Sequence, residues 1–296
     1  MVDGYDPYLG FAVESLITDA DGAEAVNPRS GRRRITPLTS HVIPAAMDGK
    51  IAVISGTGIE MEGGAISIDT PFGRVEAKVS ELEDDTVLFI PRHGRSHLPP
   101  HRVNYRALLW AAKGWGALRA ISTNTVGTMS WHPVGSFVVP RDFVELTRSR
   151  PSTFFEEEAV HVDLTTPYCP EVRRALVDGA KAAGATVSGG VYVCTEGPHL
   201  ESPAQIRMLR RFGDVVGMTG YPEVALAREM ELCYASICIV TNTAAGMRKD
   251  AMAASEITGQ MERSSSLLME IIAAAASKMP EERGCRCGSA LTDARL

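Results

Sequence analysis

The chain has 296 residues, 45% of them hydrophobic, which is enough to bury the core of one large domain or of two ordinary ones. A formal net charge of −6 and a pI near 5.7 argue against a nucleic-acid partner, which would favour a basic face. Apolar runs stay short of the roughly 20 residues of a membrane-spanning helix, and the first ten residues lack the pattern of a secretory signal, so we expect a soluble, cytoplasmic protein.

The first fifty residues form a poorly patterned segment that contains several prolines. We interpret residues 1–50 as an N-terminal extension, partly loose or laid on the surface. A basic cluster at Arg29 and residues 32–34 is most simply a solvated face, with a phosphate or RNA contact as the alternative.

Ordered structure is predicted to begin at Ile51, where the buried strand IAVIS runs into Gly56, Thr57 and Gly58. A glycine-rich turn after a strand leaves backbone N–H groups free, and with the Thr57 hydroxyl they can hold an anion. The turn lacks the spacing and lysine of a P-loop and the third glycine of a dinucleotide fingerprint, so neither nucleotide class is supported. A hairpin with its turn at residues 69–73 follows.

A second buried strand, residues 86–91, ends in Arg92, His93, Gly94, Arg95, Ser96 and His97. Two arginines and two histidines in six residues are costly to bury without an anionic partner, although a plain surface turn is the alternative. The planar guanidinium fork of arginine matches phosphate oxygens, which favours a phosphate site. Residues 104–113, apolar nearly all round, are predicted to form a buried helix.

The third strand, residues 118–122, is followed by a polar stretch at 123–128 that we interpret as another anion-friendly turn. Another strand is expected to begin at residues 136–140. Residues 151–170 are predicted to form a long loop carrying His161 and Asp163. An amphipathic helix is expected over residues 171–183.

The stretch from Val191 to Gly246 is the one around which the chain is organised. Apolar, uncharged runs at residues 191–194 and 233–240 are typical of buried strands. Polar clusters follow at residues 195–201, 217–220 and 241–246. Ligands bind off the carboxyl ends of strands in α/β sheets, so these clusters predict one small-molecule pocket.

Residues 253–279 form a strong helical run that Pro280 stops, and we expect the tail, residues 280–296, to be mobile. The tail contains the Cys-x-Cys sequence of Cys285 and Cys287, whose one-residue spacer permits a strained, reducible disulfide. A thiol-disulfide activity, a tail lock and an inert end are the alternatives for this pair.

The other four cysteines are scattered along the chain and are most simply buried thiols. They are Cys169, Cys194, Cys233 and Cys238. The histidines show no metal-ligand spacing, so no metal is predicted.

Six motifs in order resemble the trimeric family of purine nucleoside phosphorylases and methylthioadenosine phosphorylases, and most of all its S-methyl-5'-thioinosine branch. They are SGTG at 55–58, RHGR at 92–95, TNTVGT at 123–128, TEGPHLES at 195–202, GMTGYPEVALARE at 217–229 and VTNTAAG at 240–246. The resemblance covers residues 51–279. It implies a single α/β domain with a twisted mixed sheet flanked by helices. It also implies a homotrimer or a dimer of trimers, with active sites near subunit boundaries.

The resemblance also assigns roles to residues, one motif at a time. The residues implied to hold phosphate are Thr57, Arg92, His93, Thr125 and Thr219. Met218 would touch the ribose, and Leu200, Glu201 and Asn242 would face the purine. The alternatives are a helix start for Glu201, a core position for Met218 and a turn role for Asn242.

At the 5' position of the sugar, family members that act on ordinary nucleosides place a polar group, often histidine. Here the matching segment carries Ala254 and Ile257 and no histidine. An apolar wall suits a methylthio group. The neighbouring subunit's His161 is implied as a further lid contact.

The implied reaction is phosphorolysis, in which inorganic phosphate is a co-substrate and no cofactor is needed. Cleavage of the bond between base and sugar passes through an oxocarbenium-like sugar. Glu201 and Asn242 stand where the methylthioadenosine enzymes carry a serine and an aspartate. This pair favours a 6-oxopurine, with methylthioinosine as first substrate, methylthioadenosine as runner-up and general 6-oxopurine phosphorolysis as a further alternative. A hydrolytic nucleosidase would have little use for the Arg92 and His93 turn.

Overall fold

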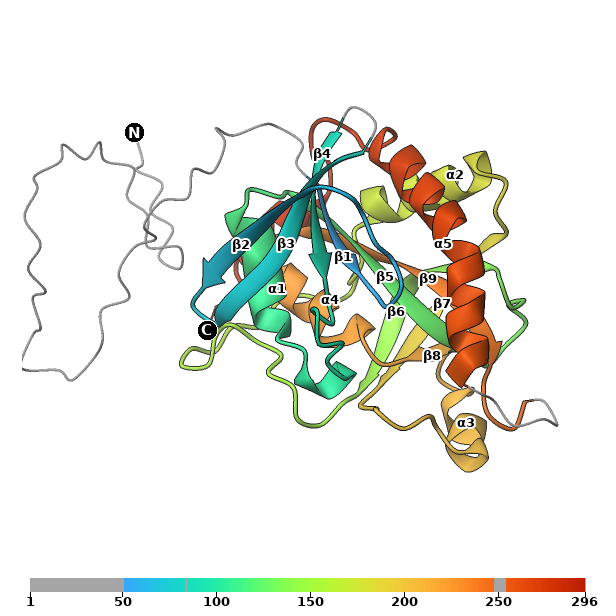
Figure 1. The fold of residues 1–296 in the computed structure, drawn as a ribbon. Helices are drawn as coiled ribbons and strands as arrows, with labels where there is room; N and C mark the ends of the chain where they lie inside the picture. Colours follow the sequence, from blue (N-terminus) through green and yellow to red (C-terminus); the bar gives the residue numbers. More distant parts are fainter. Residues whose placement is uncertain (1–50, 83–84, 248–253, 296) are drawn as a thin grey trace, which may run out of the picture. The chain divides into compact units, whose positions relative to one another are not determined.

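The computed structural model describes residues 51–82, 85–247 and 254–295 (Figure 1). The N-terminal extension expected over residues 1–50 lies outside the described residues. Among the helices described, none combines the length and the hydropathy that crossing a bilayer demands.

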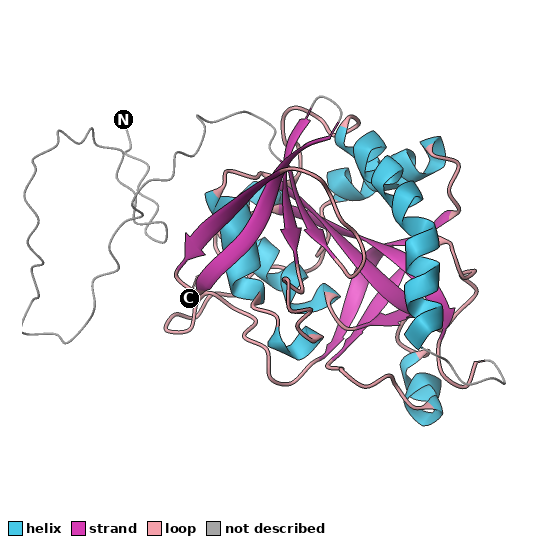
Figure 2. Ribbon diagram, in the orientation of Figure 1, coloured by secondary structure: helices cyan, strands magenta, loops and turns pink. Residues whose placement is uncertain are grey.

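The described residues form an α/β fold, as predicted, in which helices flank one mixed sheet (Figure 2). The strands are β1 (Ile51–Ser55), β2 (Gly64–Thr70), β3 (Gly73–Leu82), β4 (Asp85–Pro91), β5 (Arg119–Thr128), β6 (Phe137–Leu146), β7 (Val187–Thr195), β8 (Val215–Gly217) and β9 (Cys233–Thr243). The α-helices are α1 (Tyr105–Gly114), α2 (Pro170–Ala182), α3 (Pro203–Leu209), α4 (Gly220–Glu229) and α5 (Ala254–Ala276). Two short 3₁₀ turns cover Pro100–Arg102 (η1) and Arg286–Ser289 (η2).

The strand order is β2-β3-β4-β1-β5-β8-β7-β6-β9, and β9 also pairs with β5. The strands from β5 to β9 therefore close into a ring, while β1 to β4 extend from it as an open sheet. Strands β4, β1, β5 and β9 run parallel, so their carboxyl ends meet at the same edge. Ligands bind at that edge in open α/β sheets.

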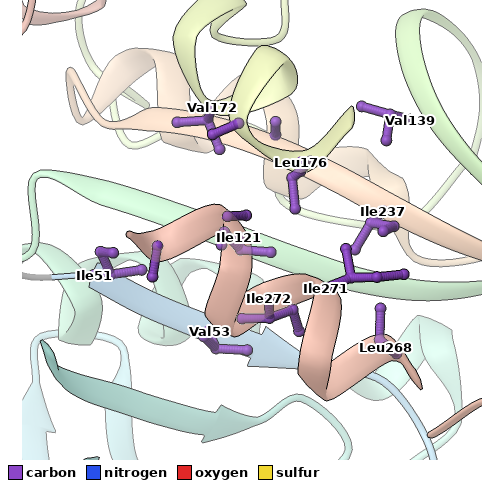
Figure 3. Close-up of a cluster of buried hydrophobic side chains, with 14 of the residues drawn as sticks. Ile51, Val53, Ile121, Val139, Val172, Leu176, Ile237, Leu268, Ile271 and Ile272 are labelled. Atoms are coloured by element: carbon purple, nitrogen blue, oxygen red, sulfur yellow. The ribbon is translucent and has the colours of Figure 1, made fainter. Parts of the chain in front are cut away.

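The two faces of the open sheet are covered by different helices because side chains alternate along each strand. Ile51 and Val53 face α2 and α5, whereas Ala52 and Ile54 face α1 and α4. Figure 3 shows the first of these cores, where Ile271 and other α5 side chains meet α2 and the sheet. Burying each such aliphatic side chain contributes about 1.5–3 kcal/mol.

Two polar stretches predicted as turns are in part strand. The stretch at residues 123–128 continues β5, and residues 241–243 continue β9. Their polarity is matched inside the sheet: the Thr123 hydroxyl accepts a hydrogen bond from the Gly56 N–H (2.8 Å), and Asn124 Oδ1 accepts one from the Thr219 hydroxyl (2.7 Å). Satisfied polar groups can lie in a buried strand, so polarity alone misplaced the strand ends.

The expectation of a mobile tail was wrong. The Arg119 guanidinium, on a side chain that is almost fully buried, donates to the Pro280 carbonyl. The Gly284 N–H donates to Glu171 (2.8 Å), and the Ala294 carbonyl accepts from His161 N–H (2.7 Å). The tail is thus held against the rest of the fold by hydrogen bonds to residues distant in sequence.

Candidate active site

A cavity of about 380 Å³ lies at the carboxyl ends of the parallel strands. It is lined by nearly all the residues that the sequence analysis assigned to phosphate, ribose and purine: Thr57, Arg92, His93, Thr125, Leu200, Glu201, Met218, Thr219, Asn242 and Ile257. The converging polar clusters predicted from the sequence therefore do build one pocket.

Two predicted residues stand apart from this group. His161 is exposed in the loop before α2 and does not line the cavity of its own chain. Its predicted lid contact requires a neighbouring subunit. Ala254 begins α5, but its side chain lies outside the described part of the chain.

One end of the cavity is lined by residues of the turns that follow β1 and β4 and by Thr125 of β5. Thr57 Oγ1 lies 3.2 Å from His97 Nε2, a residue that the sequence analysis noted without assigning it a role. Gly58 has a φ of 70°, in the left-handed region that favours glycine, which turns the chain sharply beside the cavity. Because the Gly56 N–H already donates to Thr123, the anion-binding donors left in this turn are fewer than the sequence suggested.

His93 is partly buried at the same end. Its Nδ1 lies 2.7 Å from the Leu98 carbonyl, and a carbonyl can only accept, so Nδ1 carries the proton. Burial and the neighbouring Arg92 charge lower the pKa of His93 to about 4. The ring is therefore neutral at physiological pH when no anion is nearby, and Nε2 is its unprotonated nitrogen.

Arg92 reaches the cavity wall but its charge is already partnered. The side chains of Arg92 and Glu223 are both fully buried, and Arg92 Nε donates to Glu223 Oε1 at 2.5 Å. Arg92 also donates to the Thr123 carbonyl (2.9 Å) and the Ser122 hydroxyl (2.6 Å). This geometry makes Arg92 a brace between β4, β5 and α4.

Glu223 is one residue of this site that sequence reasoning missed. It also accepts hydrogen bonds from Ser122 (2.7 Å) and from the Tyr234 hydroxyl (2.9 Å). The sequence holds only a faint signal: one acidic residue in the first turn of a helix whose other charged residues, Arg228 and Glu229, lie at its end. Such a position is ordinarily exposed at a helix N-terminus, and only the fold shows that it is buried against Arg92.

At the other end of the cavity, Asn242 is nearly buried on β9 beside an irregularity in the pairing with β5. Val126 pairs with Val240 and Gly127 with Asn242, so Thr241 is the extra residue. Its hydroxyl donates to Asn242 Oδ1 (2.9 Å), while Asn242 Nδ2 donates to the Thr243 carbonyl (3.2 Å). These partners fix the amide orientation, and within the described residues one Nδ2 hydrogen is left for a ligand.

Glu201 follows β7 and accepts a hydrogen bond from the Thr195 hydroxyl at 2.6 Å. Ser202, not Glu201, caps helix α3, because the Ser202 hydroxyl accepts from Gln205 N–H. The alternative in which Glu201 serves mainly to start this helix is therefore not needed. Among the residues that the structure describes, none donates a hydrogen bond to its second carboxylate oxygen.

A buried arginine that the sequence analysis did not single out ties the loops of the site together. Arg150 donates to the carbonyls of Met218 (2.6 Å), Tyr221 (2.8 Å) and Glu196 (2.6 Å). The backbone that carries Met218 and Thr219 is thus held against the end of β7. No motif around Arg150 points to this role, since its partners are backbone carbonyls distant in sequence.

The fold and the site together define an α/β protein whose cavity has one end lined by Thr57, His93 and Thr125 and another lined by Glu201 and Asn242. The family profile described as the Phosphorylase superfamily matches residues 50–277. The chain belongs to this superfamily.

Relatives of similar length match most of the chain. A probable S-methyl-5'-thioinosine phosphorylase of Methanosarcina acetivorans is 49% identical over 80% of this chain and 93% of its own length. A second protein of that description, from Methanothermobacter thermautotrophicus, is 49% identical over 82% and 89%. The 6-oxopurine nucleoside phosphorylase of Pyrococcus furiosus is 42% identical over 83% and 98%.

Solved structures share the fold. A methylthioadenosine phosphorylase from Schistosoma mansoni in complex with tubercidin superposes with a TM-score of 0.78 at 27% identity, over 83% of this chain and 98% of that one. A methylthioadenosine phosphorylase from an Antarctic soil metagenomic library gives a TM-score of 0.76 at 31% identity, over 83% and 92%.

Proposed function

We propose that this protein catalyses phosphorolysis of a 5'-methylthio purine nucleoside, with S-methyl-5'-thioinosine preferred, to a free 6-oxopurine base and 5-methylthioribose 1-phosphate. The observation that carries the proposal is that one cavity holds both the Thr57, His93 and Thr219 end and the Glu201 and Asn242 end. The names of the similar proteins from Methanosarcina acetivorans and Methanothermobacter thermautotrophicus support the same reaction. This assignment makes the chain a pentosyltransferase acting in purine salvage.

Phosphate would bind at the hydroxyl-lined end, where Thr57 and Thr125 can supply donors. The Thr219 hydroxyl lines the same end but already donates to Asn124 Oδ1 (2.7 Å), so it would have to reorient to donate to phosphate. His93 gains a second donor, Nε2–H, when it is protonated, and a phosphate anion raises the pKa that burial lowers. Phosphate binding is therefore coupled to proton uptake by His93. Holding the phosphate below the sugar carbon that bears the base makes the attack effectively unimolecular. This positioning lowers the activation barrier by several kcal/mol, roughly 7–11 at most.

The purine would lie between Asn242 and Glu201. The free Nδ2 hydrogen of Asn242 can donate to the base as negative charge builds on it in the transition state, and such preorganised donors often supply the largest catalytic contribution. A Glu201 carboxylate accepts from the ring N–H of a 6-oxopurine. Adenine presents an unprotonated ring nitrogen at that position, so the Glu201 carboxylate would have no donor to accept from.

Ile257 lines the cavity from α5 and supports an apolar wall at the 5' position. A methylthio group gains from that contact. A 5'-hydroxyl would lose its water without gaining a partner from this side chain, which costs about 1–3 kcal/mol.

Base release from a panel of methylthioinosine, methylthioadenosine, inosine, guanosine and adenosine, with and without inorganic phosphate, tests the proposal. We expect cleavage only with phosphate and the highest kcat/KM for methylthioinosine. Cleavage at the same rate without phosphate would instead indicate a nucleosidase. Faster cleavage of methylthioadenosine at limiting substrate would show that Glu201 and Asn242 do not read the base as proposed.

We further propose that the chain assembles as a trimer or a dimer of trimers. Leu98 and Leu200 are exposed apolar residues that line the cavity, and Trp131 is 71% exposed. These side chains suit a neighbouring subunit, as does the implied lid role of His161. Light scattering should give a mass of three or six chains, and a monomer at assay concentration would contradict the proposal.

A further inference from the structure

Four cysteines from separate parts of the sequence lie close together at the amino end of β9, and none of them lines the active-site cavity. Cys169 precedes α2, Cys233 begins β9, and Cys285 and Cys287 belong to the tail. All four are free thiols, and their sulfur atoms all lie within 4.8 Å of one another. This is the one group of histidine, cysteine or carboxylate side chains with metal-ligand spacing among the residues the structure describes.

The arrangement matches a tetrahedron of sulfur around one ion. With a zinc–sulfur distance of about 2.3 Å, a regular tetrahedron places its sulfurs about 3.8 Å apart. Cys285 Sγ lies 3.4 Å from Cys233 Sγ and 3.7 Å from Cys169 Sγ. Two separate disulfides would require closeness only within each pair, whereas a central ion requires all four sulfurs to be near one another at once.

The surroundings of the sulfurs also suit a thiolate site. Cys169, Cys233 and Cys287 are almost fully buried, and Cys285 is partly buried, so a bound ion would be shielded from water. Four thiolates and one divalent cation carry a net charge of −2. The Arg228 guanidinium, itself mostly buried, donates to Cys287 Sγ at 3.6 Å and offsets part of that charge.

We propose that Cys169, Cys233, Cys285 and Cys287 form a structural site for a divalent zinc ion that fastens the tail to α2 and β9. Each thiol loses its proton to solvent when the ion binds, so no oxidant or reductant takes part. Because every position of the tetrahedron is filled by protein, the ion stabilises the fold and leaves no position open for a substrate. The prediction of no metal rested on histidine spacing and did not consider these thiols together.

Metal analysis of the full chain, purified under reducing conditions from zinc-supplemented cells, tests the proposal. We expect about one zinc per chain. After chelation, added cobalt(II) should give the visible absorption bands of tetrahedral thiolate coordination. Under non-denaturing conditions, local opening of the tail should let an alkylating reagent reach the four thiols once zinc has been removed. The chelated protein should therefore be labelled at four more cysteines than the zinc-bound protein. Chelation should also lower the midpoint of thermal unfolding.

The paired variant Cys285→Ser with Cys287→Ser should lose the zinc, and its unfolding midpoint should no longer respond to chelator. Cys194→Ser is the matched control, because Cys194 is a buried thiol outside the cluster; it should keep the metal. The wild-type measurements stand even where a variant folds poorly. Wild-type protein without zinc or cobalt binding would overturn the proposal, and so would zinc that the paired variant retains. Disulfides between these cysteines in protein prepared without air would overturn it as well.

Discussion

Replacing Glu223 by glutamine should destabilise the protein far more than a single isosteric change on a helix usually does. The Glu223 side chain is fully buried and its oxygens accept from Arg92, Ser122 and Tyr234. Glu223→Gln removes the charge that balances Arg92 and turns an NH₂ group toward donors. Removing one partner of a buried ion pair costs about 3–5 kcal/mol, so we expect a loss of that size in the free energy of unfolding.

The assay is denaturant unfolding monitored by circular dichroism, with Glu229→Gln as the control. Glu229 lies on the same helix and is also nearly buried, but its carboxylate accepts from the Phe154 N–H (2.7 Å) and pairs with no arginine of the described ranges. Burial raises the pKa of Glu229, so a neutral amide is easier to accommodate there. We expect the control to lose about 1 kcal/mol or less.

A double variant separates a paired role from two independent ones. Arg92→Met together with Glu223→Leu removes both charges, and such replacements are often close to neutral in buried pairs. The double variant should therefore lose less stability than the sum of its single changes. If the stability losses of the single variants add up to that of the double variant, or if Glu223→Gln is as stable as the wild type, Arg92 and Glu223 do not act as a stabilising pair. An Arg92→Ala variant that keeps its stability while its phosphate KM rises would make Arg92 a direct phosphate ligand, as the sequence first suggested.

Four further predictions concern the cavity. In an NMR titration, His93 should have a pKa of about 4 without phosphate and a higher one with it, because the anion stabilises the imidazolium; an unchanged pKa would place His93 away from phosphate. Since this folded-state pKa lies below the ordinary 6.5, the contribution of neutral His93 to stability should be lost as the pH falls from about 6.5 to about 4, and His93→Gln should flatten that part of the pH profile. Glu201→Gln should lower kcat/KM for methylthioinosine more than for methylthioadenosine, and an equal loss for both would exclude base reading by this residue. Ile257→Ser should narrow the preference for methylthioinosine over inosine by about tenfold, which corresponds to roughly 1.4 kcal/mol, and an unchanged ratio would remove Ile257 from the 5' wall.

Much of the fold could be predicted because apolar patterning marks its elements directly. The buried strand at Ile51 and the hairpin around residues 69–73 were found as predicted. Strand ends were harder: Asn124 and Asn242 look like turn residues in sequence, yet side-chain and sheet partners hold both in strands.

The cavity could be predicted because its residues follow strands in recognisable motifs, whereas its supports could not. Glu223 and Arg150 act through partners distant in the chain, and neither stands in a pattern that announces burial. The cysteine cluster has the same origin. Sequence shows Cys285 and Cys287 as neighbours, but only the packing of the tail brings them to Cys169 and Cys233.

The ring made by β5 to β9 has a consequence for how molecules of this protein meet. Within the described residues, every strand except β2 pairs on both sides along at least part of its length. Strand β2 alone offers a whole unpaired margin, and exposed strand margins are where another chain can add and extend a sheet into an aggregate. That margin is seven residues long, is broken by the polar Ser67 and Asp69, and ends in a tight turn. Association through strand addition is thereby confined to one short and poorly suited segment.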